Sequence, residues 1–282
     1  MAMNPAWPGG VPTVKTGLAR ACLLLAACWA GGAHGGVSCP QRPIRFAFYE
    51  IGQFYSAGRG LDRDVAEELR RRSGCEFEFV VMPRARIWQE LEAGSLDMTG
   101  SVIETPERSK IYWFFNYIQL RQYAILSIDV PDSIRSMESF IQDAPSSRWA
   151  IVRSYSTSRY FDPLVLQLGV QRRLVEVAEE DVLFRMLDQR RVAGIFSTPM
   201  VYRQKIRQHG LEDRVKVADW EKDDAPSPRS LVLTKRAFPD SEARAWRQLV
   251  DGMNRDDTML RLINRYMSRD EAAAAVWAGG KR

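Results

Sequence analysis

Histidine is almost missing from this sequence of 282 residues, which contains only His34 and His209. Catalytic zinc sites and Ser-His-Asp triads depend on imidazole groups held close to their partners, so this scarcity argues against both kinds of centre. Glycine-rich phosphate loops are missing as well, because neither a GxGxxG pattern nor a GxxxxGK run occurs. Dinucleotide-binding and P-loop enzymes are therefore excluded as functional classes.

The chain also lacks a strong excess of charge of either sign. It carries 40 Lys and Arg against 35 Asp and Glu, a net charge of +5, which is too small to predict a nucleic-acid partner. The arginines at 70–72 stand among acidic residues in a helical pattern, which favours a solvated helix face; a phosphate-binding groove is the alternative. With 45% hydrophobic residues, the chain is long enough for two packed lobes.

Long apolar runs are confined to the N-terminus. Two basic residues precede an apolar run at 21–30, which is too short to span a bilayer but typical of a secretory signal. We predict a signal peptide over residues 1–35. The alternative is a lipoprotein signal over residues 1–27, which would leave the protein lipid-anchored through Cys28. Both interpretations place the mature protein in the periplasm.

Cysteine is scarce too, with four residues in the chain. Cys22 and Cys28 fall in the predicted leader, which leaves Cys39 and Cys75 in an oxidising compartment. We predict a disulfide between these two, which would tie the N-terminus to the region after the first helix and contribute about 4 kcal/mol on a chain-entropy argument. The alternative is a pair of free, buried thiols.

Strands and helices are predicted to alternate along the mature chain. Apolar alternation predicts strands at 44–49 and 76–82, and helical spacing predicts helices at 62–72 and 84–92. The further elements expected are a strand at 123–128, a helix at 134–142, a strand at 149–153, a helix at 158–168, a strand at 173–177, a helix at 180–189, strands at 194–196 and 230–234, and helices within 240–269. Such an order predicts an α/β fold in which the second lobe has a largely parallel sheet.

Two polar passages divide this series of elements. The chain changes character at 120–122, and a segment rich in Asp and Pro at 223–228 marks a second crossing. We therefore predict two αβ lobes joined by two hinge crossings, the first lobe at 39–119 plus 227–270 and the second at 123–224. A clamp of this kind is expected to bury its ligand between the lobes.

The stretch at 91–115 combines several signals in order. A helix end is followed by a short strand at 96–101 and then by a TPER turn. Pro106 favours entry into a helical turn and Thr105 can cap that turn, which places Arg108 beside free backbone donors. A guanidinium in such a turn suits the binding of an anion.

An L-x-x-G-x-x-D helix end, a strand of small residues, the TPER turn and an aromatic run together resemble the extracellular solute-binding proteins of family 3, the amino-acid type of periplasmic binding protein. The resemblance implies a type II periplasmic-binding fold in which Arg108 grips a carboxylate of the ligand. It also implies that an aromatic side chain of the first loop stacks on the ligand and that the turn at 153–158 contacts it. The ligand-binding residues expected on this basis are Arg108, Thr105, Ser101, Tyr49, Tyr55, Tyr155, Ser156, Thr198 and Arg84. Core packing is the alternative role for the aromatic residues, and helix capping for the turn.

The segment at 190–198 departs from the family pattern. The pattern G-R-x-D-A-x-x-x-D contains two acids, of which the second holds the ammonium group of an amino acid. Both acids are missing here, and Thr198 stands at the second position. Because a hydroxyl cannot neutralise a buried cation, this difference counts against an α-amino acid as the ligand.

From the resemblance we predict a monomeric solute-binding protein that captures a small carboxylate-bearing solute, amino-acid-like or another organic acid, for an ABC permease in the inner membrane. No metal, cofactor, nucleic-acid partner or covalent chemistry is expected. One alternative is a periplasmic dehydratase of the cyclohexadienyl type, which needs an acid-base carboxylate near the arginine; Glu104 and Glu50 are the candidates. Another alternative is a sensory binding protein that presents its ligand to a membrane receptor.

Overall fold

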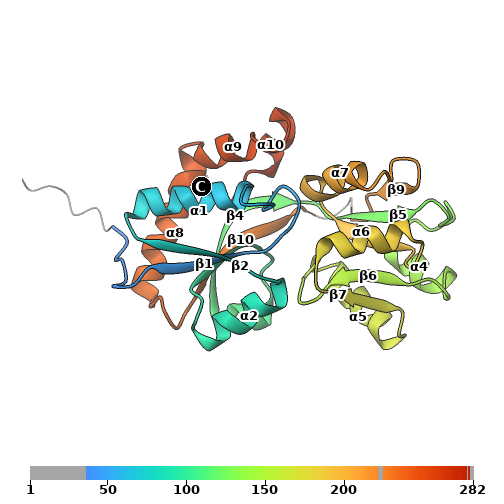
Figure 1. Cartoon of the computed structure of the whole chain (residues 1–282), viewed down its shortest axis with the longest axis horizontal. Coiled ribbons are helices and arrows are strands. Elements are labelled where there is room, and N and C mark those ends of the chain that lie inside the picture. Colours follow the sequence, from blue (N-terminus) through green and yellow to red (C-terminus); the bar gives the residue numbers. More distant parts are fainter. Residues whose placement is uncertain (1–35, 222–224, 278, 280–282) are drawn as a thin grey trace, which may run out of the picture. The chain divides into compact units, whose positions relative to one another are not determined.

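The computed structural model describes residues 36–221, 225–277 and 279 (Figure 1). The predicted signal peptide, its lipoprotein alternative and part of the predicted second crossing lie outside the described residues. Among the described helices, none is both long enough and apolar enough to cross a membrane.

The strands of the described residues form two five-stranded sheets. The first sheet has the order β2 (Phe77–Val81), β1 (Ile44–Phe48), β3 (Met98–Val102), β10 (Ser227–Thr234) and β4 (Tyr112–Leu120). Strand β1 is parallel to β2 and β3, whereas β10 is antiparallel to β3 and β4. Because β10 follows the whole second sheet in sequence, the first sheet combines residues from both ends of the described chain.

Helices cover the first sheet through their apolar faces. Helix α1 (Leu61–Ser73) buries one stripe of residues at helical spacing, as the sequence predicts. Helix α2 (Arg84–Ala93) lies on the opposite side of β1 and β2 from α1 (Figure 1). It ends at Gly94, whose φ of 78° lies in the left-handed region that glycine enters without strain.

The C-terminal helices complete the first lobe. The predicted helical region divides into α8 (Asp240–Arg255), α9 (Thr258–Ile263) and α10 (Arg269–Ala275). Trp246 of α8 is fully buried and its ring meets that of Phe77 edge-on at 6.2 Å. Helix α8 therefore packs on β2, an edge strand of the first sheet, and anchors the C-terminal segment there.

The second sheet mixes parallel and antiparallel strands. Its order is β7 (Leu174–Val177), β6 (Trp149–Val152), β8 (Gly194–Ser197), β5 (Tyr123–Ser127) and β9 (Val215–Ala218). Strand β6 is parallel to β7 and β8, but β5 is antiparallel to both β8 and β9. Strands β7, β6, β8 and β9 therefore all run in one direction and β5 alone runs against them, so the prediction of a largely parallel sheet is right except at β5. Strand β9 was not predicted, because it is a short edge strand with only a weak apolar pattern.

The helices of the second lobe are α4 (Met137–Asp143), α5 (Phe161–Val170), α6 (Glu180–Asp188) and α7 (Pro199–Gln208). Helix α4 begins three residues later than predicted. The reason is a capping box, in which Ser136 Oγ accepts a hydrogen bond from the backbone N–H of Ser139 at 3.1 Å. Helix α7 was not predicted, although Pro199 at its first position is a common start signal.

The chain passes between the sheets twice, first after Leu120 and again between Ala218 and Ser227. Arg121 connects the two passages, because its guanidinium donates to the backbone oxygen of Glu221 and pairs with Asp219 at 3.7 Å. The predicted lobe limits fall at these passages. We still only predict that the two lobes are separate units and that they move about a hinge.

Cys39 and Cys75 are joined by a disulfide, as predicted. Cys75 follows the end of α1 directly, so the bond fastens the segment before β1 to the C-terminus of that helix. Such a cross-link restricts the unfolded chain and so stabilises the first lobe.

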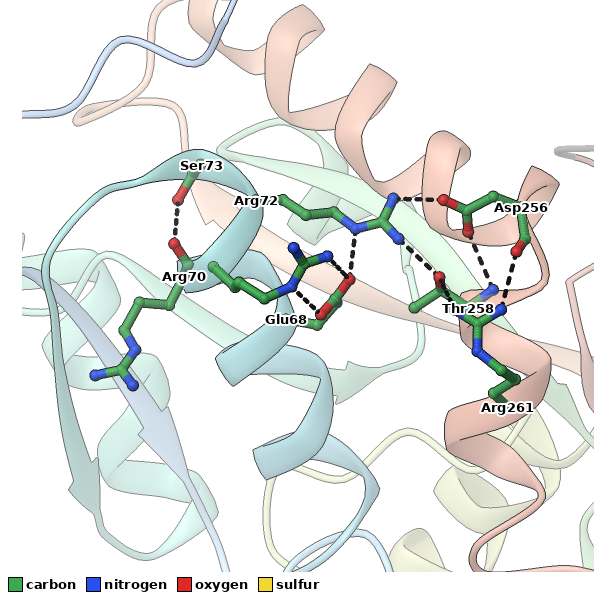
Figure 2. Close-up of polar contacts among 8 residues, drawn as sticks. Glu68, Arg70, Arg72, Ser73, Asp256, Thr258 and Arg261 are labelled. Atoms are coloured by element: carbon green, nitrogen blue, oxygen red, sulfur yellow. Dashed lines mark hydrogen bonds and ion pairs between the residues drawn. The ribbon is translucent and has the colours of Figure 1, made fainter.

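Arg72 connects α1 to the start of α9 (Figure 2). Its guanidinium donates to Glu68 Oε1 at 2.6 Å and to Thr258 Oγ1 at 2.7 Å, and it pairs with Asp256 Oδ2 at 2.8 Å. Only 20% of the side chain is exposed. A planar guanidinium that bonds three partners from separate segments contributes more to stability than an isolated surface ion pair does.

We expect Arg72→Ala to lower the free energy of unfolding by about 1 to 2 kcal/mol, because a half-buried acid and a hydroxyl lose their shared donor. The matched control is Arg71→Ala. Arg71 is 68% exposed and pairs with Glu68 one turn away, so its loss is expected to leave the stability nearly unchanged. Urea unfolding of both variants measures the difference, and equal losses would contradict the bridging role of Arg72.

Candidate ligand-binding site

A cavity of about 250 Å³ lies at the carboxyl ends of strands from both sheets. Its walls come from the segments that follow β1 and β2 in the first sheet and from those that follow β6, β7 and β8 in the second. In α/β proteins this end of the sheet is the usual place for a ligand. Four of the predicted ligand residues line the cavity, namely Tyr49, Arg84, Tyr155 and Thr198.

Tyr49 and Tyr55, the aromatic candidates of the first loop, have different surroundings. Tyr49 faces the cavity, and its buried hydroxyl has no hydrogen-bond partner in the described part of the chain. Tyr55 stacks on Phe48 with ring centroids 4.5 Å apart and planes within 3° of parallel. Tyr55 therefore packs in the core, which was its alternative role.

Arg84 begins α2 and is the most deeply buried charged group of the cavity wall, with 2% of its surface exposed. Its guanidinium lies over two aromatic rings, 4.5 Å from the centroid of Tyr49 and 5.3 Å from that of Trp88. The rings stabilise the cation but accept no conventional hydrogen bond. Within the described residues, the Nε and Nη1 groups of Arg84 have no acceptor, so both can donate to a ligand.

Arg108 lies beside this group but is not part of the cavity lining. Thr105 caps α3 (Pro106–Ser109) as predicted, since its Oγ1 accepts from the backbone N–H of Arg108 at 3.4 Å. The guanidinium lies 4.0 Å from the Trp88 ring centroid and donates through Nη2 to the backbone oxygen of Ser154 at 2.8 Å. Burial, and then the charge of Arg84, lower the pKa of Arg108 to about 10. The two guanidinium groups thus contact one indole ring and repel each other.

Ser101 belongs to a buried network next to the cavity. Its backbone φ is 55°, and its Oγ donates to Asp62 Oδ1 at 2.7 Å. The Tyr117 hydroxyl donates to the same oxygen at 2.6 Å and accepts from the backbone N–H of Ser101 at 2.8 Å. Burial raises the pKa of Asp62 to about 6, although the bonds from Tyr117 and Ser101 act to lower it. The network positions the end of β3 and uses the Ser101 hydroxyl internally.

We expect the stability of the protein to fall between pH 3.8 and about 6 because of Asp62. In this window the native state holds more protons at the site than the unfolded chain, so rising pH lowers the free energy of unfolding, by about 3 kcal/mol in all. Asp62→Asn keeps an acceptor for Tyr117 but does not titrate, so the variant should lose the part of this slope that Asp62 contributes. Urea unfolding at several pH values tests this, with exposed Asp213→Asn as the control that keeps the slope.

The donors in the turn before α5 already bind a carboxylate of the chain itself, that of Asp162. Asp162 Oδ1 accepts from the backbone N–H of Thr157 at 2.8 Å and from its hydroxyl at 2.7 Å, and Oδ2 accepts from Ser156 Oγ. These are the donors that the sequence analysis assigned to a ligand carboxylate. In this structure they bind the carboxylate of Asp162 in the first turn of α5, and only Tyr155 and Thr157 of this turn reach the cavity.

Arg229 was not singled out in the sequence. It lies in β10, is 1% exposed, and has no hydrogen-bond partner for any of its three guanidinium nitrogens among the described residues. Burial raises the pKa of Tyr49, and the charges of Arg84 and Arg229 act against this rise, which places both cations near the same phenol. An arginine inside an otherwise apolar strand was the available signal, because a buried charge without a structural partner usually serves a ligand.

Glu180 was missed as well. It opens α6, lines the cavity and is only 8% exposed, and its Oε2 has no partner in the described chain. Burial raises the pKa of Glu180 to about 8, although Lys205 acts to lower it. Near neutral pH the carboxyl group is therefore mostly protonated, and it can donate a hydrogen bond like the neighbouring hydroxyls of Ser197 and Thr198.

The cavity therefore presents hydrogen-bond donors on both of its walls. Guanidinium groups and a phenol lie toward the first sheet, and two hydroxyls and a protonated carboxyl group lie toward the second. Nowhere in residues 36–221, 225–277 and 279 do three His, Cys, Asp or Glu side chains gather as a metal site requires. The arrangement suits the non-covalent binding of a small anion.

Comparison with known proteins agrees with the fold. The family model of the bacterial extracellular solute-binding proteins, family 3, matches residues 46–269. No curated protein sequence matches the chain.

Solved structures with the same fold share little sequence with this chain. An ancestral arginine-binding protein bound to arginine is 19% identical, with a TM-score of 0.66 over 80% of this chain and 98% of that one. The arginine-, lysine-, histidine-binding protein ArtJ from Geobacillus stearothermophilus is 12% identical, with a TM-score of 0.67 over 82% and 100%. A histidine kinase sensor domain with similarity to periplasmic binding proteins is 12% identical, with a TM-score of 0.65 over 80% and 96%. At these identities the likeness extends to the two-lobed α/β fold.

Proposed function

The chain belongs to the bacterial extracellular solute-binding proteins of family 3, and on that premise we propose that it captures a small carboxylate-bearing solute in the cavity and delivers it to an ABC permease. The observation that carries this proposal is the buried guanidinium of Arg84, which lines a cavity of small-molecule size and whose Nε and Nη1 have no acceptor in the described chain. Arginine forms two parallel charge-assisted hydrogen bonds to a carboxylate, which makes such a group an anion receptor.

In this proposal Arg84 holds the carboxylate, and Arg108, which contacts the same Trp88 ring, adds positive charge next to it. Tyr49 and Tyr155 flank the ligand, and Thr198 donates from the opposite wall. The family's extracellular character, the disulfide and the predicted signal peptide support a periplasmic, monomeric protein.

Calorimetry and thermal melting with a panel of solutes test the proposal. Organic carboxylates are expected to raise the melting temperature by mass action, whereas the corresponding primary alcohols are not. Polyamines serve as the cationic arm of the panel. Stabilisation by polyamines and not by carboxylates would show that the cavity is not an anion receptor.

A dehydratase is the second candidate, and Glu180 is the observation that favours it. A carboxyl group with a pKa of about 8 in a cavity that is also lined by an arginine is what general acid catalysis on an organic acid needs. Glu50 also lines the cavity but is exposed, and Glu104 lies outside it, bonded to Ser109. Mass spectrometry of the tightest carboxylate after long incubation separates the candidates, because only an enzyme converts it, and Glu180→Gln would abolish that conversion.

The sensory alternative uses the same cavity and differs in its partner. A similar fold in a histidine kinase sensor domain makes this alternative concrete. Cross-linking of the ligand-loaded protein in inner-membrane vesicles distinguishes them, since an importer role requires capture of a permease and a sensory role requires capture of a receptor.

A further inference from the structure

The loop after β1 meets the start of α7 in the second lobe through its backbone. The N–H of Gln53 donates to the backbone oxygen of Met200 at 3.0 Å. Gly52, the residue before Gln53, has a φ of 46°, in the left-handed region. A Cβ atom at Gly52 would lie 2.8 Å from the Cα of Val201 and 2.9 Å from the oxygen of Met200. Carbon atoms in ordinary contact lie about 3.5 to 4.0 Å apart, so a side chain does not fit between these two segments.

The loop is held in place on the first sheet. The N–H of Ile51 donates to the backbone oxygen of Tyr55 at 2.8 Å, and the Tyr55 ring stacks on Phe48 of β1. The N–H of Asp62, in the first turn of α1, donates to the backbone oxygen of Phe54 at 2.9 Å. The loop therefore has little freedom to move away from a side chain added at its contact with α7.

The start of α7 is held in the second lobe in the same way. Helix α7 follows β8 directly, and the N–H groups of Val201 and Tyr202 both donate to the backbone oxygen of Thr198 at 2.9 Å. Met200 and Val201 are each 1% exposed, so the helix is packed at the contact. Neither partner of the contact can easily give way, and the backbone of Gly52 therefore sets how closely the two segments approach.

This contact adjoins the ligand cavity. Ile51, the residue before Gly52, lines the cavity from the first lobe, and Thr198 and Val201 line it from the second. A change in the distance between Gly52 and Val201 would therefore change the distance between the two cavity walls. The cavity holds about 250 Å³, so its walls lie close to any small solute that it binds.

Other contacts that join the lobes use long side chains. Arg203 of α7 pairs with Glu271 of α10, and the guanidinium of Arg108 donates to the backbone oxygen of Ser154 at 2.8 Å. A long side chain can change its rotamer and follow a small displacement of its partner. The backbone contact at Gly52 cannot adjust in this way, so it limits the approach of the walls.

We propose that Gly52 is a specificity-determining residue, whose contact with α7 fixes the spacing of the cavity walls and so favours short solutes. A larger residue at position 52 would hold the walls apart. A short carboxylate would then lose contacts with one wall, and a longer one would gain room. This inference rests on the proposed function and adds to it a limit on the length of the solute.

Calorimetry with straight-chain monocarboxylates of two to eight carbons tests this limit. The variant is Gly52→Ala and its matched control is Gly58→Ala. Gly58 lies in the same loop and has a φ of 83°, but a Cβ atom there would have no other atom within 4 Å. Both variants carry the strain of a side chain in the left-handed region, whereas only Gly52→Ala adds a contact with α7.

We expect the wild type and Gly58→Ala to share the same tightest probe. Gly52→Ala should bind that probe at least tenfold more weakly, and its own tightest probe should be longer by one carbon or more. An unchanged order of probes in Gly52→Ala, or the same change in both variants, would overturn this inference and leave the proposed function standing. If no carboxylate binds to the wild type, the proposed function falls and this inference falls with it.

Amide hydrogen exchange of the ligand-free protein tests the contact itself. The Gln53 amide is expected to be protected in the wild type and in Gly58→Ala, and to exchange at least tenfold faster in Gly52→Ala. The Asp62 amide should stay protected in all three proteins, which would show that the loop remains on the first sheet. An unprotected Gln53 amide in the wild type, or a protected one in Gly52→Ala, would overturn the role of Gly52.

Asparagine replaces alanine in this pair if Gly52→Ala does not fold. Asparagine enters the left-handed region more readily than most residues, yet it carries a Cβ atom. Gly52→Asn therefore keeps the contact with α7 and reduces the backbone strain, and Gly58→Asn is its control. The same two measurements decide, with the same outcomes for and against the role of Gly52.

Discussion

Replacing Arg84 by alanine is expected to weaken binding of the tightest carboxylate by about 3 to 5 kcal/mol, which is a few hundredfold or more in Kd. The reason is that a buried ligand carboxylate would lose the guanidinium that lines the cavity and has two donors without an acceptor in the described chain. Arg84→Lys should not restore binding, because an ammonium group cannot form two parallel hydrogen bonds. Folding should not suffer, since the native side chain is a buried cation without an acid partner in the described chain.

The comparison variant is Arg108→Ala. The sequence analysis assigned the carboxylate to Arg108, but its guanidinium is turned to the Ser154 backbone and the Trp88 ring. We expect its loss to weaken binding by about 1 to 2 kcal/mol, through the charge that it adds behind Arg84. Calorimetry measures the loss of ligand affinity in both variants and so shows which arginine holds the carboxylate. A large effect for Arg108→Ala with a small one for Arg84→Ala would return the carboxylate to Arg108.

Glu180→Gln is expected to stabilise the ligand-free protein at pH 9 by on the order of 4 kcal/mol. Burial raises the pKa of Glu180 from 4.5 to about 8, so between these values the native state holds a proton that the unfolded chain has lost. The free energy of unfolding of the wild type therefore falls as the pH rises through this window. An amide at this position does not titrate, so the variant should lose that slope.

Between pH 7 and 8 Glu180 dominates the slope, because the pKa of Asp62 is about 6 and that group is mostly ionised by pH 7. The neighbouring variant Glu179→Gln is the control, since Glu179 is exposed and one residue away. Parallel pH profiles for the two variants would show that Glu180 ionises normally.

Local signals were enough to predict the elements that depend on few residues. Apolar alternation predicted β1, β2 and β6, and apolar helical spacing predicted α1 and α2. Thr105 caps the turn that holds Arg108, as the TPER segment predicts. The pairing of Cys39 with Cys75 also followed from the sequence, because no other cysteine remains once the predicted leader is set aside.

Other features depended on contacts between distant segments. The place of β5 between β8 and β9, antiparallel to both, is set by pairing across about 70 to 90 residues, which no local pattern encodes. The donors of the turn before α5 were expected to face a ligand, but Asp162 lies close enough to take them. A hydroxyl or an amide binds whichever acceptor the fold brings nearest, and the sequence does not state that distance.

By itself, the sequence determined the family, the α/β class and the disulfide, and it named Arg84 and Arg108 as candidates for binding an anion, because these follow from periodicity, composition and ordered motifs. Only the tertiary structure decided which arginine faces the cavity. It also brought Arg229 of β10, which lies 145 positions beyond Arg84, to the same tyrosine, and it buried Glu180 deeply enough to keep its proton. Burial and the distances between charges set the pKa values of these groups. Both arise only when segments that are far apart in the sequence come together, as β1 and β10 do in the first sheet.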